Sequence, residues 1–242
     1  MLNNAWVVAI ARPSATHNEE RLVVPISREE FADAYPTLFH ISLAEDIGQV
    51  MTHGLLSTSA LLDRCGVIGE QRFGIESCPR PRSVRISHAV YGEFLINDQA
   101  PMNAAALAKC LTDLSPEQWC RSLNRRVFFW PTRGRLAKHI GARLSVGHPK
   151  IVFSFETRSV LDVLDFASFE FSPINSGNTM RKAAVRGSST FLKASDYPFQ
   201  ERRQRRGLSD AIAEVTYPYA ITSSQLAAIC MTSKIVLHPR PA

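Results

Sequence analysis

Glu214 lies in an apolar segment, where burying a carboxylate would cost free energy. In the segment 210–220, the alternation of a strand places Glu214 on the same face as Ile212 and Thr216. Burying a carboxylate among apolar neighbours on a central strand costs free energy unless something uses it, whereas an exposed edge strand would remove that cost. A fixed carboxylate can stabilise developing positive charge and accept a proton, so Glu214 is a candidate for chemistry if its strand is buried.

A polar pair near the start of the chain is the second candidate for chemistry. Residues 37–42, Thr-Leu-Phe-His-Ile-Ser, predict a short buried strand whose His40 and Ser42 point into a cleft. Residues 46–50 then predict one helical run, and Gly54 lies where its C-cap belongs. A histidine between apolar residues is also typical of a hydrogen-bonded core position, and this alternative stays open.

A third block, residues 123–131, carries a basic residue into an aromatic strand. Val127 to Trp130 are four large apolar residues in a row before Pro131, which predicts a fully buried strand entered by Arg126. Residues 136–140 predict the next helix, with Gly141 as its cap, and residues 151–157 predict a further strand. A strand, helix and strand in this order occur in many folds, so the pattern is informative only because it follows the His40 strand.

The remaining segments predict the scaffold. Ser27 and Glu30 match a capping box, which starts a helix that Pro36 stops. Further helices are predicted over 59–66 and 104–111 and from Ser115, which Pro follows at the first helical position. Residues 70–99 predict loops with at most one helix. The polar, turn-rich residues 172–179 could line a ligand cleft, but a surface crossing is favoured.

Composition limits the class of protein. The 242 residues fit one large domain, 45% of them are hydrophobic, and no stretch approaches the length needed to span a membrane. The first eleven residues lack a basic leader and a long hydrophobic region, so we expect no secretion signal. Five scattered cysteines without CxxC spacing support neither a metal site nor a disulfide framework. These features predict a reduced, cytoplasmic protein.

Basic residues gather in three segments of a chain whose net charge is +6. Each Lys or Arg that neutralises a phosphate releases counterions, so such runs favour a polyanionic partner such as DNA or RNA. A solvated charged face is the common alternative, and the charge could equally attract a dinucleotide. The segments are 80–85, 121–135 and 202–206, the last of which we expect to be mobile.

These motifs, in this order, resemble the ADP-ribosyltransferases. The His40 strand, short helix and Gly54-Leu55 turn resemble the opening of the DarT toxins, which use NAD to modify DNA. The aromatic strand, helix and strand resemble the middle of this family and of the related RNA 2′-phosphotransferases. Most specific is Ala-Glu-Val followed by Pro218, which is similar to the segment that carries the catalytic glutamate in DarT-like enzymes.

The resemblance covers residues 37–220 and implies an α+β fold with a split, two-sheet core and flanking helices. The whole chain would be a single domain, with an N-terminal arm and helix over 1–36, the core over 37–220 and a C-terminal extension over 221–242. No GxGxxG motif, Walker loop, HExxH or GxSxG is present, which disfavours Rossmann dehydrogenases, P-loop NTPases, zincins and α/β-hydrolases.

The resemblance also implies a reaction, the transfer of ADP-ribose from NAD to an acceptor. Breaking the bond between nicotinamide and ribose develops oxocarbenium-like charge, which Glu214 would stabilise while accepting the acceptor's proton. His40 would bind the other ribose, and Arg126 would bind the pyrophosphate, with Arg125, Arg85 and Arg133 as alternatives. The expected NAD-binding set, without a metal, is His40, Ile41, Ser42, Gly54, Leu55, Arg126 and Phe129, and Trp130 could replace Phe129 in stacking on the nicotinamide.

One departure from the family pattern bears on the acceptor. Two residues before Glu214 stands Ile212, where family members that modify arginine have Glu and those that modify asparagine or cysteine often have Gln. With the basic segments, this favours a nucleic-acid or small-molecule acceptor over a protein. A base in DNA or RNA is the leading choice, in a bacterial toxin or defence enzyme that could have an antitoxin partner. The alternatives are an RNA 2′-phosphotransferase-like enzyme, which needs no catalytic glutamate, and a non-catalytic nucleic-acid-binding module.

Overall fold

Antiparallel strands from distant parts of the chain form the centre of the fold. The computed structural model describes residues 24–99, 102–143, 149–179 and 183–229. Strand β1 (Thr37–Leu43) pairs with β6 (Lys150–Glu156) along its whole length. A four-stranded sheet has the order β5-β9-β7-β8, formed by β5 (Arg126–Phe129), β9 (Glu214–Pro218), β7 (Glu170–Ser172) and β8 (Leu192–Lys193).

Two backbone hydrogen bonds connect these sheets where β1 passes the end of β5. The N–H of Phe39 donates to the carbonyl of Trp130 at 3.0 Å, and the N–H of Trp130 donates back at 2.8 Å. Two smaller pairs complete the strands: β2 (Leu55–Leu56) with β10 (Ala220–Ile221), and the hairpin of β3 (Val84–His88) and β4 (Gly92–Ile96). This arrangement confirms the α+β class.

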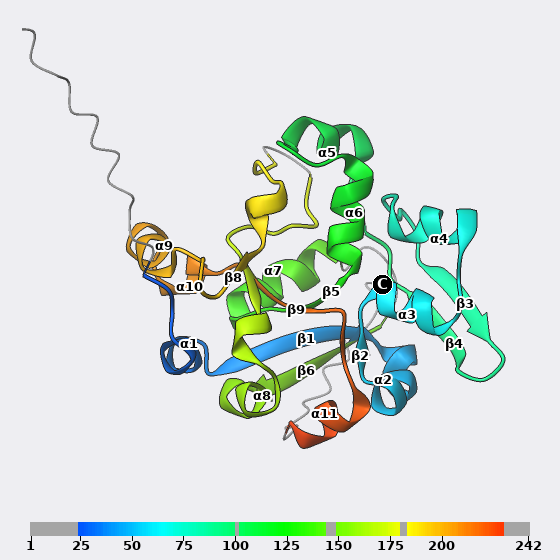
Figure 1. Cartoon of the computed structure of the whole chain (residues 1–242), viewed down its shortest axis with the longest axis horizontal. Helices are drawn as coiled ribbons and strands as arrows, with labels where there is room; N and C mark the ends of the chain where they lie inside the picture. Colours follow the sequence, from blue (N-terminus) through cyan, green and yellow to red (C-terminus); the bar gives the residue numbers. More distant parts are fainter. Residues whose placement is uncertain (1–23, 100–101, 144–148, 180–182, 230–242) are drawn as a thin grey trace, which may run out of the picture.

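Helices surround the strands. In Figure 1, α8 and α11 lie below β1 and β6, and α1 and α2 lie at the left and right ends of β1, whereas α3 to α6 and the β3–β4 hairpin occupy the upper and right-hand parts of the view. The helices are α1 (Arg28–Ala34), α2 (Ile47–His53), α3 (Thr58–Arg64), α4 (Gly69–Glu76), α5 (Ala104–Cys110), α6 (Pro116–Asn124), α7 (Arg133–Arg143), α8 (Thr157–Val163), α9 (Phe199–Arg206), α10 (Leu208–Ala211) and α11 (Ser223–Ala228), with single 3₁₀ turns η1 (Ala44–Asp46), η3 (Phe166–Ser168) and η4 (Ser188–Thr190).

Local sequence signals account for several helix ends. Ser115 and Gln118 form a reciprocal capping box at α6, with Pro116 at the first helical position, as predicted. At α1 the Ser27 hydroxyl accepts the N–H of Glu30 at 3.0 Å, but the Glu30 carboxylate accepts a hydrogen bond from Gln200. The predicted N-cap of α1 is therefore confirmed, whereas the reciprocal half of its capping box is replaced by a tertiary contact.

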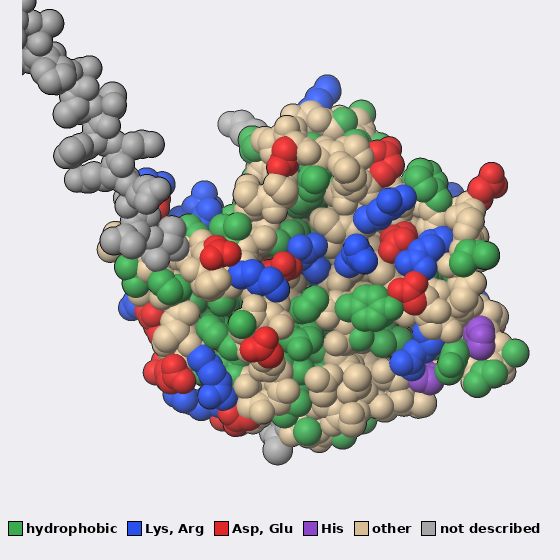
Figure 2. Space-filling view, viewed as in Figure 1, with side chains coloured by type: hydrophobic (Ala, Val, Ile, Leu, Met, Phe, Trp, Pro, Cys, Tyr) green, Lys and Arg blue, Asp and Glu red, His purple; other side chains and the backbone are tan. Residues whose placement is uncertain are grey.

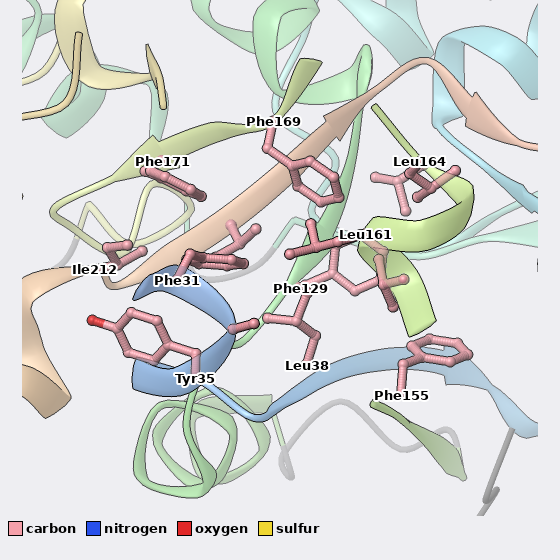
Figure 3. Packing of buried hydrophobic residues seen from close by; sticks show 14 of the residues in the cluster. Phe31, Tyr35, Leu38, Phe129, Phe155, Leu161, Leu164, Phe169, Phe171 and Ile212 are labelled. Carbon is pink, nitrogen blue, oxygen red and sulfur yellow. The ribbon is translucent and has the colours of Figure 1, made fainter. Parts of the chain in front are cut away.

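The main core lies between the β1–β6 pair, the four-stranded sheet and the helices below them. Figure 3 shows the α1 ring of Phe31 against Phe171 of β7, with their ring centroids 5.0 Å apart. Phe129 and Phe155, from β5 and β6, meet edge to face in the same cluster. Leu226 and Ile229 are also buried there, so the chain just beyond β10 packs into this core.

Three predicted elements differ from the observed ones. Residues 70–99 contain α4 and the β3–β4 hairpin rather than mainly loops. Helix α7 runs through Gly141 to Arg143, so this glycine is not a cap. The basic residues 202–206, expected in a mobile segment, belong to helix α9, whose Phe199 is fully buried. In each case tertiary packing, rather than local composition, determines the secondary structure of the segment.

Candidate functional site

A cavity of about 280 Å³ lies where β1, β5 and β9 meet the loop 172–179. Its walls include His40 of β1, Arg126 of β5 and Glu214 of β9. A second cavity of about 200 Å³ adjoins it and reaches Ser42 and Gly54. The two cavities have six lining residues in common, namely His40, Ile41, Leu56, Ser57, Thr58 and Asn97.

His40 is fixed in one tautomer by the neighbouring sheet. Its Nδ1 lies 2.8 Å from the carbonyl oxygen of Phe128. Because a carbonyl only accepts, Nδ1 carries the proton and Nε2 is left as an acceptor. Burial lowers the pKa of His40 to about 4, and the bond to Phe128 offsets only part of this effect. At neutral pH His40 is therefore an uncharged hydrogen-bond acceptor in the wall of both cavities.

Glu214 lies on β9, an inner strand of the four-stranded sheet, and is only 4% exposed. The backbone N–H of Ser176 lies 3.1 and 3.2 Å from its two carboxylate oxygens. Burial raises the pKa of Glu214 to about 7, while hydrogen bonds from Ser176 and the charges of Arg186 and Arg135 oppose this rise. A carboxyl group with a pKa near 7 is suited to exchange protons at neutral pH.

The loop that contacts Glu214 is held by a buried arginine. Arg186 is 2% exposed, and its guanidinium donates to the carbonyl of Ser176 at 2.6 Å and to that of Asn178 at 2.9 Å. Asn175 to Asn178 line the larger cavity. The favoured surface crossing for residues 172–179 is therefore wrong, and this loop forms one wall of the site.

Arg126 lines the larger cavity, but other groups of the protein already hold most of its guanidinium. Nε donates to Glu170 at 2.9 Å, Nη1 donates to the carbonyl of Ser122, and the group lies 4.2 Å from the ring centroid of Phe191. Burial lowers the pKa of Arg126, and Glu170 opposes this shift. Within the described part of the chain, no hydrogen bond of Nη2 is found, so this nitrogen is the one available to a ligand.

The alternative arginines lie elsewhere. Among the described residues, neither cavity is lined by Arg125, Arg85 or Arg133. Arg85 pairs with Glu45 and Glu93, and Arg133 lies over the ring of Phe39 at 5.6 Å. Arg126 is thus the member of the predicted set that the fold brings to the cavity.

Two residues of the expected NAD-binding set face the core. Phe129 is 1% exposed and packs with Phe155, and Leu55 is 2% exposed on β2. These two assignments are corrected, because side chains of a strand alternate and Phe128, not Phe129, points to the cavity. Trp130 also lines the cavity, beside the ring of His139 at a centroid distance of 4.2 Å.

Several polar residues of the cavity wall could not be predicted from the sequence. Arg80 is 6% exposed and donates to the carbonyl of Asn97 and to the side chain of Asn124 at 3.0 Å. The sequence predicts a basic surface segment here, but Arg80 is buried and connects the residue after β4 to α6 beside the cavity. No local signal marks Arg80, Asp98 or Gln99, which come together beside α6 only in the folded chain. His139 reaches the cavity from α7, and Ser176 belongs to the loop 172–179 described above.

The basic segments are more neutralised than the sequence suggests. Figure 2 shows Lys and Arg side chains in a band across the middle of one face, with acidic side chains among them. Ion pairs join Arg135 to Asp210, Arg203 to Glu30 and Arg205 to Glu201, besides those of Arg85 and Arg126. Counting arginines therefore overestimates the charge that a polyanion would meet.

We predict that Glu214 makes the stability of the protein pH-dependent. Below its ordinary pKa of 4.5, Glu214 is protonated in both the folded and the unfolded state. Between 4.5 and about 7 the unfolded chain loses this proton while the folded chain keeps it, so the free energy of unfolding falls as pH rises. The total loss is about 3 kcal/mol. Urea unfolding measures this effect. Between pH 5 and pH 8 the free energy of unfolding of the wild type should fall by about this amount relative to that of Glu214→Gln. Equal pH dependence of the two proteins would contradict the prediction.

Two further properties concern ligands and membranes. Within the described residues, no group of three or more His, Cys, Asp or Glu side chains is placed to hold a metal ion. No helix in the same part of the chain is long and apolar enough to cross a bilayer.

The comparisons with known proteins place the chain in a family without giving it an activity. No curated protein and no solved structure matches it. A family described as a family of unknown function, DUF7002, matches residues 36–227, a range that includes the strands from β1 to β10 and the residues that line both cavities. The chain belongs to the DUF7002 family.

Proposed function

We propose that this protein transfers ADP-ribose from NAD to a base in DNA or RNA. The observation that carries the proposal is that His40 and Glu214, on strands far apart in the sequence, line one cavity. The resemblance to ADP-ribosyltransferases requires this meeting, and neither residue's local sequence dictates it. The β1–β6 pair and the four-stranded sheet, joined at Phe39 and Trp130, also support a split two-sheet core of this kind.

Glu214 would stabilise the charge that develops when nicotinamide leaves. Its ionised carboxylate would bind a hydroxyl of the attached ribose and then accept the proton of the attacking base. The N–H of Ser176 fixes the carboxylate, so little reorganisation is needed as charge appears on the sugar. Since the pKa of Glu214 is about 7, activity should rise with pH through neutrality.

The two adjoining cavities provide room for the two halves of a dinucleotide. His40 lies in the wall between them, and its Nε2 would accept a hydrogen bond from the second ribose. Nη2 of Arg126 would contact the pyrophosphate. Trp130 and Phe128 offer apolar surface in the larger cavity, and Ser42 and Gly54 lie in the smaller one.

The sharpest test of NAD as substrate combines binding with turnover. At NAD concentrations about 100 times its dissociation constant, we expect about 2.7 kcal/mol of stabilisation in a thermal melt. Incubation with labelled NAD and a mixture of DNA, RNA and protein should release nicotinamide and label nucleic acid. Arg85→Ala, which changes an arginine outside both cavities, is a control variant and should bind and cleave NAD as the wild type does. The absence of both stabilisation and nicotinamide release would overturn the proposal.

The biological role follows from the same chemistry. An enzyme that modifies nucleic-acid bases inside a bacterial cell would act as a toxin or defence enzyme and would need an antitoxin. Expression of the wild-type chain should then arrest growth, while expression of Glu214→Gln at the same level should not.

A further inference from the structure

A groove between α4 and α6 has the properties of a second binding surface. Its volume is about 450 Å³, and Arg72, Phe73, Arg121 and Arg125 line it. None of its lining residues lines either cavity of the candidate site. Figure 2 shows the basic band crossing the region where Figure 1 places α4, α6 and the end of β9.

The charges of this groove are unequally neutralised. Arg72 forms ion pairs with Asp63 and Glu76, so these two carboxylates are already engaged. Arg121 donates to the hydroxyl of Ser77 at 2.8 Å, and Arg125 is exposed. Among the described residues neither Arg121 nor Arg125 forms an ion pair. Residues four apart on a helix face the same side about 6 Å from each other, so these two arginines present neighbouring positive charges.

Two exposed aromatic residues lie near the arginines: Phe73 lines the groove, and Tyr219, beside it, is hydrogen-bonded through its backbone to Arg125. Phe73 is 47% exposed, and Tyr219 is 44% exposed. Tyr219 has φ +62°, a conformation that residues other than glycine rarely adopt. Its N–H donates to the carbonyl of Arg125 at 2.8 Å, and its hydroxyl donates to Asp63 at 2.6 Å. The fold therefore keeps a large ring at the surface, next to Arg125, in a strained conformation.

We propose that this groove binds single-stranded nucleic acid and delivers it to the candidate site, an inference that rests on the proposed function. Arg121 and Arg125 would contact successive phosphates, while Phe73 and Tyr219 would stack on bases. Rings can stack only on bases that are not already stacked in a duplex, which is why a single strand fits best. Strand β9 connects the two sites directly, since Tyr219 follows it and Glu214 begins it, about 17 Å away.

The test measures the binding of labelled 12-mers to the Glu214→Gln chain by fluorescence anisotropy, without NAD. Single-stranded DNA and RNA are separate arms, and a duplex is the comparison. We expect a single strand to bind more tightly than the duplex. Arg121→Ala with Arg125→Ala should weaken binding on the order of tenfold and reduce the slope of log K against log salt by about 1.4. Tyr219→Asn, which tolerates this backbone conformation, should also weaken binding, whereas Tyr219→Phe should not.

The matched control is Arg205→Ala with Arg206→Ala on α9, at the opposite side of the view in Figure 1. It removes the same charge and should leave affinity for the single strand nearly unchanged. Equal weakening by both double variants, or equal affinity for the duplex, would overturn the assignment, as would no binding. If single strands bind but the wild-type chain does not cleave NAD, the proposed function is refuted and the groove assignment stands. If the wild-type chain cleaves NAD but single strands do not bind, the groove assignment is refuted and the proposed function stands.

Discussion

Glu214→Gln should lower the rate of nicotinamide release from NAD by about 10³-fold. The amide has nearly the same shape as the carboxylate, and its oxygen can still accept the N–H of Ser176, which lies 3.1 Å from Oε1 in the native protein. It cannot carry the negative charge that opposes an oxocarbenium ion or accept a proton from the acceptor. The effect should appear in kcat at pH 8, where Glu214 is ionised in the native enzyme, with little change in KM.

The control for this variant is Glu156→Gln, the same change at another strand residue. Glu156 ends β6, is exposed and lines neither cavity. It should keep full activity. If Glu214→Gln instead retained the native rate, the reaction would need no carboxylate at this position, and an RNA 2′-phosphotransferase-like reaction would explain the cavity better. If neither protein cleaved NAD, a nucleic-acid-binding module without catalysis would remain.

The strands that carry the candidate residues could be predicted because their signals are local. Alternation and apolar runs identified β1 and β9, and the central position expected for Glu214 is confirmed by its place between β5 and β7. The meeting of His40 with Glu214 did not follow from alternation. It depends on the pairing of β5 with β9 and on the bridge between Phe39 and Trp130, which are contacts between distant segments.

The phase of a buried strand was harder to predict than its existence. In β5, Phe128 and Phe129 have nearly identical local propensities, yet one faces the cavity and the other the core. An uninterrupted apolar run gives no alternation from which to choose between them. The partner strand fixes the phase, because Phe129 pairs with Val215, the neighbour of Glu214.

The polar wall of the cavity escaped prediction for a different reason. Arg186 and Ser176 act through backbone groups: the guanidinium holds the loop carbonyls, and the loop N–H holds Glu214. Such bonds constrain geometry but leave little pattern in a single sequence. The charge of Arg80 and Arg126 was likewise visible in the sequence, whereas their burial and internal partners were not.

Gly54→Ala should destabilise the protein by about 4 kcal/mol or more, the largest effect we expect on stability. Gly54 ends α2 with φ +86° and ψ −168°, a conformation that glycine alone adopts readily. A Cβ atom there would overlap the carbonyl oxygen of Ile221 and lie 2.6 Å from the carbonyl carbon of Thr222. The backbone must therefore move, which would separate β2 from β10 beside the smaller cavity.

Gly48→Ala is the matched control, because Gly48 lies within α2, which Gly54 caps, and has nothing within 4 Å of the added atom. Alanine there should stabilise the protein slightly. Urea unfolding of both variants would decide the matter, since similar small effects would mean that the close approach at Gly54 does not hold these strands together.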